Sequence, residues 1–170
     1  LSFNYMSQTL KNGVFNNMKN LVFLNLSYNR LDFYYREAFN ELNTTLKVLD
    51  LSNNEFHFKM RGMGHRLEFI RGLTNLEVLS LANNGIGMRI DERLTSSSLK
   101  YFYFGGNHLD IMWGSDNNKY THFFQDLTNL IYLDISNNAL KSISPEVLCN
   151  LPGNIKKLCI SHNKLNYFPC

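Results

Sequence analysis

The stretch that decides the fold of this chain is Leu21-Val22-Phe23-Leu24-Asn25-Leu26-Ser27-Tyr28-Asn29-Arg30-Leu31. It has the form Leu-x-x-Leu-x-Leu-x-x-Asn-x-Leu, and the same phrase returns five more times, with other apolar residues at some leucine positions. Successive copies start 25, 30, 23, 31 and 25 residues apart. This recurrence predicts a repeat architecture with six readable strands. Each copy is closed by an asparagine: Asn29, Asn54, Asn84, Asn107, Asn138 and Asn163.

The phrase is that of a leucine-rich repeat, which predicts an α/β solenoid with a curved parallel sheet on its concave face. Apolar residues of each copy point inward and the intervening residues face out along the sheet. The convex side is expected to be mostly irregular and short-helical, because its apolar pairs lack helical periodicity. The asparagine side chains are expected to be structural, bonding backbone groups where the chain leaves each strand. The convex apolar pairs are Phe39 with Leu42, Ile70 with Leu73, Phe124 with Leu127, and Leu148 with Leu151.

Residues 1–170 are interpreted as one partial leucine-rich repeat domain of about seven repeats. Asn4 falls three residues after Leu1, where an asparagine of the repeat is expected, and Cys170 lies inside a further repeat. Neither end carries a capping motif, so we expect a longer ectodomain and apolar surface at both ends of this segment.

Composition narrows the function only partly. The formal net charge of +3 is too small to indicate a nucleic-acid-binding protein by itself. Cys149, Cys159 and Cys170 have neither metal-site spacing nor an even count, so we expect no metal site, no cofactor and no internal disulfide framework. Asn43-Thr44-Thr45 and Asn25-Leu26-Ser27 are sequons, and Asn43, in a predicted loop, is the better glycosylation candidate.

The first overlong repeat carries a basic loop after its strand. Its cations could meet phosphates, its glycines would allow close backbone approach, and its histidines would gain charge in an acidic compartment. A solvated loop whose glycines only serve turns is an equally good interpretation. The loop runs through His57, Lys59, Arg61, Gly62, Met63, Gly64, His65 and Arg66.

Three other features have a stronger structural than functional interpretation. The second overlong repeat contains Trp113, which is expected to anchor its loop onto the solenoid. Asp32 could accept hydrogen bonds from a base, but a surface pair with Arg30 or Arg36 is the simpler expectation. The concave face combines aromatic residues and lysines, but its carboxylates favour an ordinary solvated sheet. Its outward residues include Tyr101, Tyr103, Tyr132, Lys156, Lys157, Asp50, Asp134 and Glu77.

No arrangement of nucleophile, base and oxyanion donors is recognisable, and no phosphate loop is present. The chain is therefore predicted to be a recognition surface rather than an enzyme.

The same loops resemble the endosomal nucleic-acid-sensing Toll-like receptors, the subfamily of receptors seven, eight and nine. The resemblance covers essentially the whole chain. It is carried by Asn29-Arg30-Leu31-Asp32, Gly62-Met63-Gly64-His65, Leu67-Glu68-Phe69-Ile70, and Asn107-His108-Leu109-Asp110-Ile111-Met112-Trp113. Gly64-His65, Met112-Trp113, His122-Phe123-Phe124-Gln125 and Leu130-Ile131-Tyr132-Leu133-Asp134 look closest to the sensor of unmethylated CpG DNA, Toll-like receptor nine. Glu68-Phe69-Ile70 and Asp110-Ile111 look more like the sensors of single-stranded RNA and nucleosides.

In the nucleoside sensors, the residues matching Asp32 and Gly62-Met63-Gly64 line a small-ligand pocket. Gly64 stands where those relatives carry threonine, and Tyr34 where they carry a smaller apolar residue, which argues against nucleoside binding. By resemblance to the DNA sensor, the contact candidates become Lys59, Arg61, His65 and Arg66.

The resemblance implies an innate immune receptor that binds CpG-type DNA and signals through ligand-induced dimerisation. It further implies a single-pass membrane protein with cytoplasmic adaptor partners, whose lumenal side faces the endosome, lysosome and endoplasmic reticulum. The alternatives are an RNA or nucleoside sensor of the same subfamily, and a secreted or cell-surface leucine-rich repeat protein that binds protein partners.

Overall fold

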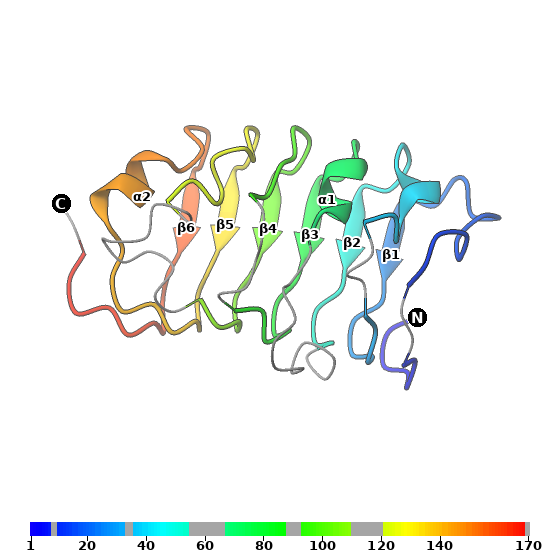
Figure 1. Ribbon diagram of the computed structural model, residues 1–170, viewed down its shortest axis with the longest axis horizontal. Helices are drawn as coiled ribbons and strands as arrows, with labels where there is room; N and C mark the ends of the chain where they lie inside the picture. The colour runs from blue at the N-terminus through cyan, green and yellow to red at the C-terminus, as the bar shows by residue number, and fades with distance from the viewer. Residues whose placement is uncertain (8–9, 33–35, 55–66, 88–92, 110–120, 169–170) are drawn as a thin grey trace.

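The computed structural model describes residues 1–7, 10–32, 36–54, 67–87, 93–109 and 121–168. Six short strands lie side by side in one parallel sheet, in chain order, as the repeat phrase predicts (Figure 1). Equivalent residues of successive copies pair in register, so that Leu24 is opposite Leu49 and Leu49 is opposite Leu79. The strands are β1 (Phe23–Asn25), β2 (Val48–Asp50), β3 (Val78–Ser80), β4 (Tyr101–Tyr103), β5 (Tyr132–Asp134) and β6 (Lys157–Cys159).

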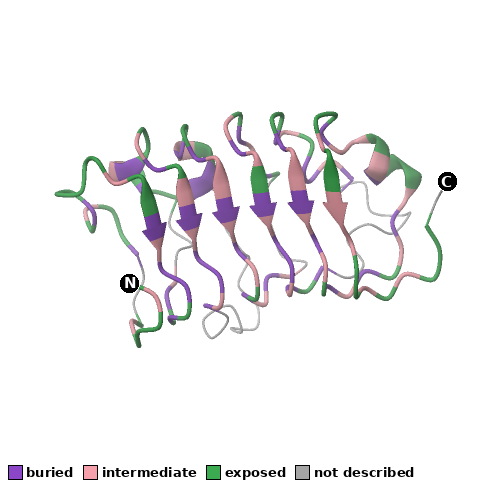
Figure 2. Cartoon of the chain, turned by 180° about the vertical axis from the view of Figure 1, so that it is seen from behind, coloured by how far each residue is buried: buried purple, intermediate pink, exposed green. Residues whose placement is uncertain are grey.

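The alternation of buried and exposed residues along each strand confirms which face is inside. The middle residue of each strand points into the solenoid and is fully buried from β2 to β5. Seen from the sheet side, the flanking residues are exposed or half-buried (Figure 2). One side of the sheet thus packs the core, and the other is an open concave face.

The convex side is short-helical and irregular, as expected. It carries the 3-10 turn η1 (Asn40–Leu42) and the helices α1 (Phe69–Gly72) and α2 (Pro145–Cys149). α2 begins at a defined residue because the Ser144 side chain accepts from the Val147 amide and Pro145 pre-sets the first turn. The predicted apolar pairs fill the core, fully buried in the first three cases and half-buried for Leu148 and Leu151. None of the described helices is long and apolar enough to traverse a bilayer.

The asparagine ladder is confirmed as structural. The side-chain Nδ2 of Asn84 donates to the carbonyls of Leu51 and Leu81, both at 3.0 Å. Its Oδ1 accepts from the backbone amide of Asn54 at 2.7 Å. Asn84 is 0% exposed, so all these backbone groups would otherwise be buried without partners. Each ladder side chain therefore joins its own turn to that of the preceding repeat.

The residue before each ladder asparagine adopts the left-handed conformation. Gly106, with φ +70°, meets this demand without strain, whereas most copies place a side chain there. The turn thus forces one residue per repeat to project outward at the carboxyl edge of the sheet. These residues are Phe3, Tyr28, Asn53, Asn83, Gly106, Asn137 and His162.

Candidate functional site

The outward-projecting turn residues form an aromatic cluster at the first two repeats. Phe3 and Tyr28 stack with centroids 4.1 Å apart and an interplanar angle of 9°. The Arg30 guanidinium lies 6.0 Å from the centre of the Tyr5 ring, which is 88% exposed. Sequence reasoning missed this cluster, although the position before the ladder asparagine could have indicated it. Aromatic and arginine side chains grouped at a surface are typical of binding sites.

Asp32 lies at the same edge, just beyond the ladder, and is half-buried. Its backbone carbonyl accepts from the Leu10 amide at 2.7 Å, which ties the turn to the preceding repeat. The Nε of Arg36, one of its two expected partners, lies 3.9 Å from Glu68 Oε2. Asp32 therefore lies at the carboxyl edge of the sheet, one repeat before the predicted basic loop that follows Asn54.

The predicted loop contacts lie outside the described residues: Lys59, Arg61, Gly62, Met63, Gly64, His65 and Arg66, together with His57. The same holds for Tyr34 and for Trp113 with most of its loop. The described flanks of the basic loop are Asn54, which is 0% exposed, and Leu67, which packs into the core. Both ends of this loop are therefore held by buried residues, and its role in binding stays a prediction.

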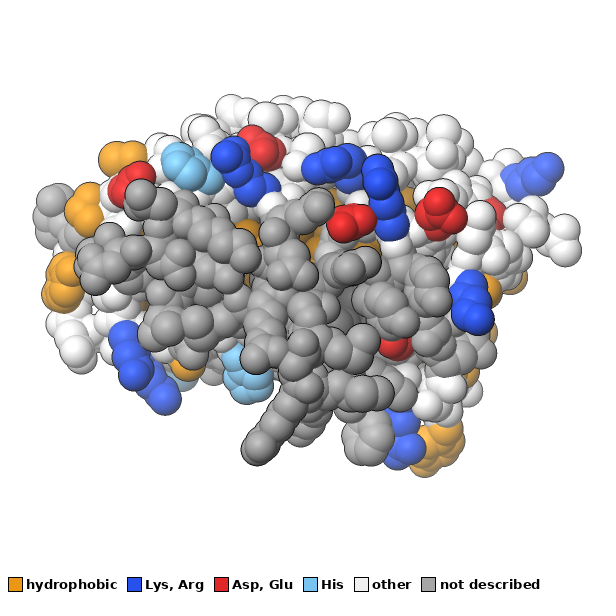
Figure 3. Space-filling view, viewed as in Figure 1, with side chains coloured by type: hydrophobic (Ala, Val, Ile, Leu, Met, Phe, Trp, Pro, Cys, Tyr) orange, Lys and Arg blue, Asp and Glu red, His pale blue; other side chains and the backbone are white. Residues whose placement is uncertain are grey.

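Charges on the convex side are mixed. Figure 3 shows lysine and arginine side chains interspersed with acidic ones along this face. A surface hollow there is lined by Arg36, Glu37, Asn40, Glu68, Arg71 and Gly72, so its two cations are matched by two carboxylates. A second pair joins Arg93 and Asp126 at 3.7 Å. The described convex surface therefore offers no strong attraction to phosphates.

On the concave face, the outward residues differ in type from one end of the sheet to the other. Outward residues at the same strand position are Phe23, Val48 and Val78 on β1 to β3, but Tyr101, Tyr132 and Lys157 on β4 to β6. The Tyr103 ring lies 5.1 Å from that of Tyr132, and the Tyr101 ring 6.5 Å. Rings and amines therefore gather at the β4 to β6 end.

Tyr132 is the centre of this group. The Cys159 thiol, which is free, donates to the Tyr132 hydroxyl oxygen at 3.5 Å, and Lys157 Nζ lies 5.3 Å from the ring centre. The contact with Cys159, burial and the neighbouring Asp134 carboxylate raise the pKa of Tyr132 above its ordinary value. The ring therefore keeps a neutral hydroxyl in both acidic and neutral solution.

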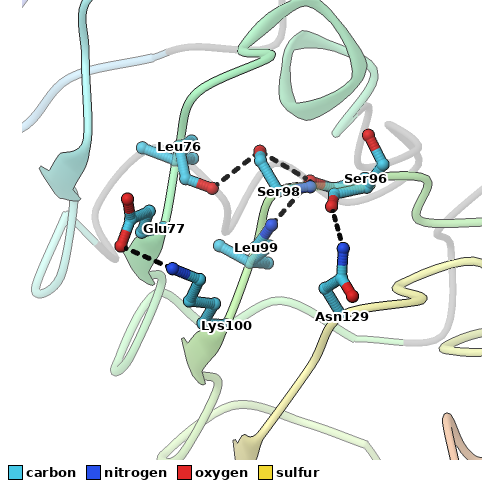
Figure 4. Close-up of polar contacts among 8 residues, drawn as sticks. Leu76, Glu77, Ser96, Ser98, Leu99, Lys100 and Asn129 are labelled. Carbon is cyan, nitrogen blue, oxygen red and sulfur yellow. Dashed lines mark hydrogen bonds and ion pairs between the residues drawn. The ribbon is translucent and has the colours of Figure 1, made fainter. Parts of the chain in front are cut away.

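The amino edge of the sheet carries a second row of asparagines that the sequence motif did not predict. Asn129 donates to the carbonyl of Ser97, and Asn154 to that of Thr128 at 2.9 Å. Asn75 donates in the same way to Thr44. Figure 4 shows Asn129 beside the Ser96 to Ser98 turn, whose Ser98 hydroxyl donates to the Leu76 carbonyl at 2.8 Å. Unlike the ladder, this row is exposed.

Lysines at this edge are partly neutralised. Lys100 Nζ lies 3.1 Å from Glu77 Oε2, from one repeat to the next (Figure 4). A hollow beside the pair also includes Lys47, Asn75 and Asn129. Its two lysines and one carboxylate give it only a small positive charge, too weak to define an anion site.

The two sequons differ in their surroundings. Asn43 is exposed at the end of η1. Asn25 is half-buried on the concave face, and its Oδ1 accepts from the Ser27 amide at 2.9 Å and the Ser27 hydroxyl at 2.7 Å. Asn43 is therefore the more accessible of the two asparagines, and its glycosylation stays a prediction.

Comparisons with known proteins agree with the repeat structure. One leucine rich repeat family model matches residues 1–56 and 121–165, and a second matches residues 45–70. Toll-like receptor 7 of Mus musculus and Toll-like receptor 9 of Homo sapiens are each 41% identical over 168 residues, 99% of this chain. Toll-like receptor 8 of Homo sapiens is 44% identical over 113 residues, 66% of the chain.

The chain spans 16% of the length of the first two receptors and 11% of the third. The near-equal identities do not distinguish among the three receptors. The chain belongs to the leucine-rich repeat family and, within it, to the subfamily of Toll-like receptors 7, 8 and 9.

Proposed function

We propose that this chain is part of the lumenal ectodomain of an innate immune receptor that recognises nucleic acid in endosomes. The carrying observation is its 41% identity, over 99% of the chain, to both Toll-like receptor 7 and Toll-like receptor 9. The open concave face and the outward turn residues support a recognition role, because both present side chains without contributing to the core.

The preferred ligand is DNA of the unmethylated CpG type, and the preferred mechanism is ligand-induced dimerisation. Gly64 supports DNA over nucleosides, because it lacks the hydroxyl that the nucleoside sensors carry at the matching position. Lys59, Arg61 and Arg66 supply positive charge that would meet phosphates, and His65 would add charge as the pH falls. The alternative within the subfamily is a sensor of single-stranded RNA and nucleosides.

The test is binding by the complete ectodomain, measured with CpG DNA, the same DNA with the dinucleotide reversed, single-stranded RNA, and nucleosides. We expect CpG DNA to bind best, more tightly at mildly acidic than at neutral pH, and to shift the protein to dimers in sedimentation velocity. Tight nucleoside binding, in the absence of CpG binding, would replace this proposal with the alternative.

The basic loop is tested by a triple variant, Lys59→Ala, Arg61→Ala and Arg66→Ala. If these residues contact phosphates, the salt dependence of binding should fall by about 2 in log-log slope. The matched control removes three exposed lysines elsewhere, Lys11→Ala, Lys19→Ala and Lys141→Ala. An equal change in the control would mean that overall charge, rather than the loop, governs binding.

The two sequons allow a separate test of the lumenal placement. We expect Asn43 to carry a glycan when the receptor is made in animal cells, because it is exposed, and Asn25 to carry little, because its side chain is engaged. Glycopeptide mass spectrometry measures both occupancies. Full occupancy of Asn25 would require that its hydrogen bonds with Ser27 form only after modification.

A further inference from the structure

The concave face carries its rings and free amines at one end, over β4 to β6. We propose that this end is a platform for single-stranded nucleic acid, built from Tyr101, Tyr103, Tyr132, Lys156 and Lys157. The inference rests on the proposed function, and it adds to it a contact surface distinct from the basic loop and from the edge that carries Asp32.

The three rings lie close together and are tilted relative to one another, with interplanar angles of 36° and 43°. Tyr101 and Tyr132 are in register on adjacent strands, and Tyr103 lies one outward position further along β4. The Tyr103 to Tyr132 and Tyr101 to Tyr132 centroid separations are 5.1 and 6.5 Å. Every nucleobase has a π-face, so neighbouring rings can receive successive bases without demanding a sequence. Tyr101 is 39% exposed and offers the most accessible ring.

The cations stand beside the rings. Lys157 is paired in register with Tyr132 and holds its amine 5.3 Å from that ring centre, and Lys156 precedes it in the chain. Both lysines are exposed, and among the described residues neither forms an ion pair. An amine beside a stacking ring can contact the phosphates of a strand whose bases lie on the neighbouring tyrosines.

The carboxylates of this face, which argue against nucleic acid in the sequence, are engaged in the structure. Asp134 Oδ1 accepts from the Ser136 amide at 2.9 Å and from the Ser136 hydroxyl at 2.6 Å. Glu77 pairs with Lys100 at 3.1 Å. The charge of Glu77 is therefore balanced by Lys100, whereas the Asp134 carboxylate keeps its charge. Lys156 and Lys157 together outweigh that one carboxylate and give this end a small positive charge.

The β4 to β6 end favours a nucleic acid over a protein partner. The centres of protein interfaces are poor in lysine, whereas single-stranded nucleic acid sites combine aromatic platforms with cations. At the equivalent strand positions, the β1 to β3 end of the same face has a single ring, Phe23, followed by Val48 and Val78. It therefore supplies matched controls.

The experiment measures fluorescence anisotropy of labelled single-stranded oligothymidine with the complete ectodomain and five variants. Tyr101→Ala should weaken binding at least about fivefold, the lower bound for loss of one stacked base. Lys157→Ala should lower the log-log salt slope by about 0.7, the effect of one phosphate on a single strand. The controls Phe23→Ala and Lys47→Ala remove an aromatic ring and a lysine at the β1 to β2 end and should leave binding unchanged. Tyr101→Phe keeps the ring and should retain affinity.

A direct readout accompanies the affinities. An oligonucleotide carrying 5-iodouracil, irradiated in the complex, should crosslink to Tyr101 or Tyr103 in peptide mapping. Unchanged affinity and slope in the Tyr101 and Lys157 variants, with intact CpG DNA binding, would overturn the platform and leave the proposed function standing. Failure of the unaltered protein to bind any nucleic acid would overturn both. Loss of dimerisation by these variants with oligothymidine binding intact would also overturn the platform, because it would indicate a protein contact.

Discussion

The two edges of the sheet each carry a row of asparagines that cross from one repeat to the preceding one. At the carboxyl edge Asn84 is 0% exposed and forms three backbone hydrogen bonds, whereas at the amino edge Asn129 is exposed and forms one. In both rows an asparagine side chain donates to a backbone carbonyl of the preceding repeat. The difference in burial teaches that the cost of losing such a bond depends on whether water can replace it.

Asn84→Ala should have the largest effect. It would leave the Leu51 and Leu81 carbonyls and the Asn54 amide buried without partners, so we expect a loss of roughly 3 kcal/mol or more in the free energy of unfolding. A urea titration of the complete ectodomain, followed by hydrogen exchange at this repeat, measures it. A loss under about 1 kcal/mol would mean that water reaches these groups and that the two rows are equivalent.

Two glycines precede an asparagine at opposite edges and sharpen the comparison. Gly106→Ala should cost about 1 to 2 kcal/mol, because φ is +70° and the new Cβ would meet the Asn83 side chain. Gly153→Ala should change stability by less than about 0.5 kcal/mol, since nothing lies within 4 Å of its Cβ. Thermal unfolding of both variants gives the comparison, and equal losses would remove the conformational argument for the carboxyl edge.

Asn129→Ala tests the exposed row. Water can replace the lost hydrogen bond at the Ser97 carbonyl, so we expect a loss below about 1 kcal/mol. The same urea titration applies, with Asn84→Ala as the reference. Asn129→Ala and Asn84→Ala giving similar losses would contradict the distinction between the two rows.

Lys100→Ala should have the smallest effect, about 0.5 kcal/mol or less. Its ion pair with Glu77 joins two side chains that are 43% and 37% exposed, and such pairs are weakened by solvent and salt. We expect the difference from the unaltered protein to shrink further at high salt. A larger, salt-independent loss would show that the lysine stem, rather than its charge, packs against the amino edge.

Features that depend on spacing within one repeat can be predicted from the sequence, and features that depend on contacts between repeats are harder to predict. The six strands, their inward residues and the buried ladder could all be predicted, because they repeat with a local period that any copy displays. The exposed asparagine row lies one residue before the repeat phrase, and its hydrogen bonds become visible only when the preceding repeat places a carbonyl beside Asn75 and Asn129.

The candidate sites show the same limit. The basic loop was recognisable as a cluster of charges along the chain, whereas the Phe3 and Tyr28 stack joins residues of different repeats. On the concave face, a count of charges in the sequence set the carboxylates of Asp134 and Glu77 against the lysines. Only the structure shows that Asp134 accepts hydrogen bonds from Ser136 and that Glu77 forms an ion pair with Lys100.

By itself, the sequence determined the solenoid, the register of its parallel sheet and the structural role of the ladder asparagines. These follow from short-range spacing, which places equivalent side chains of every copy at the same point of the repeat. The tertiary structure alone decided what the outward side chains contact: the Lys157 amine lies 5.3 Å from the centre of the Tyr132 ring, and Asp134 accepts hydrogen bonds from Ser136. These contacts depend on the side-chain rotamers in the stacked repeats, and the spacing of residues along the chain does not specify rotamers.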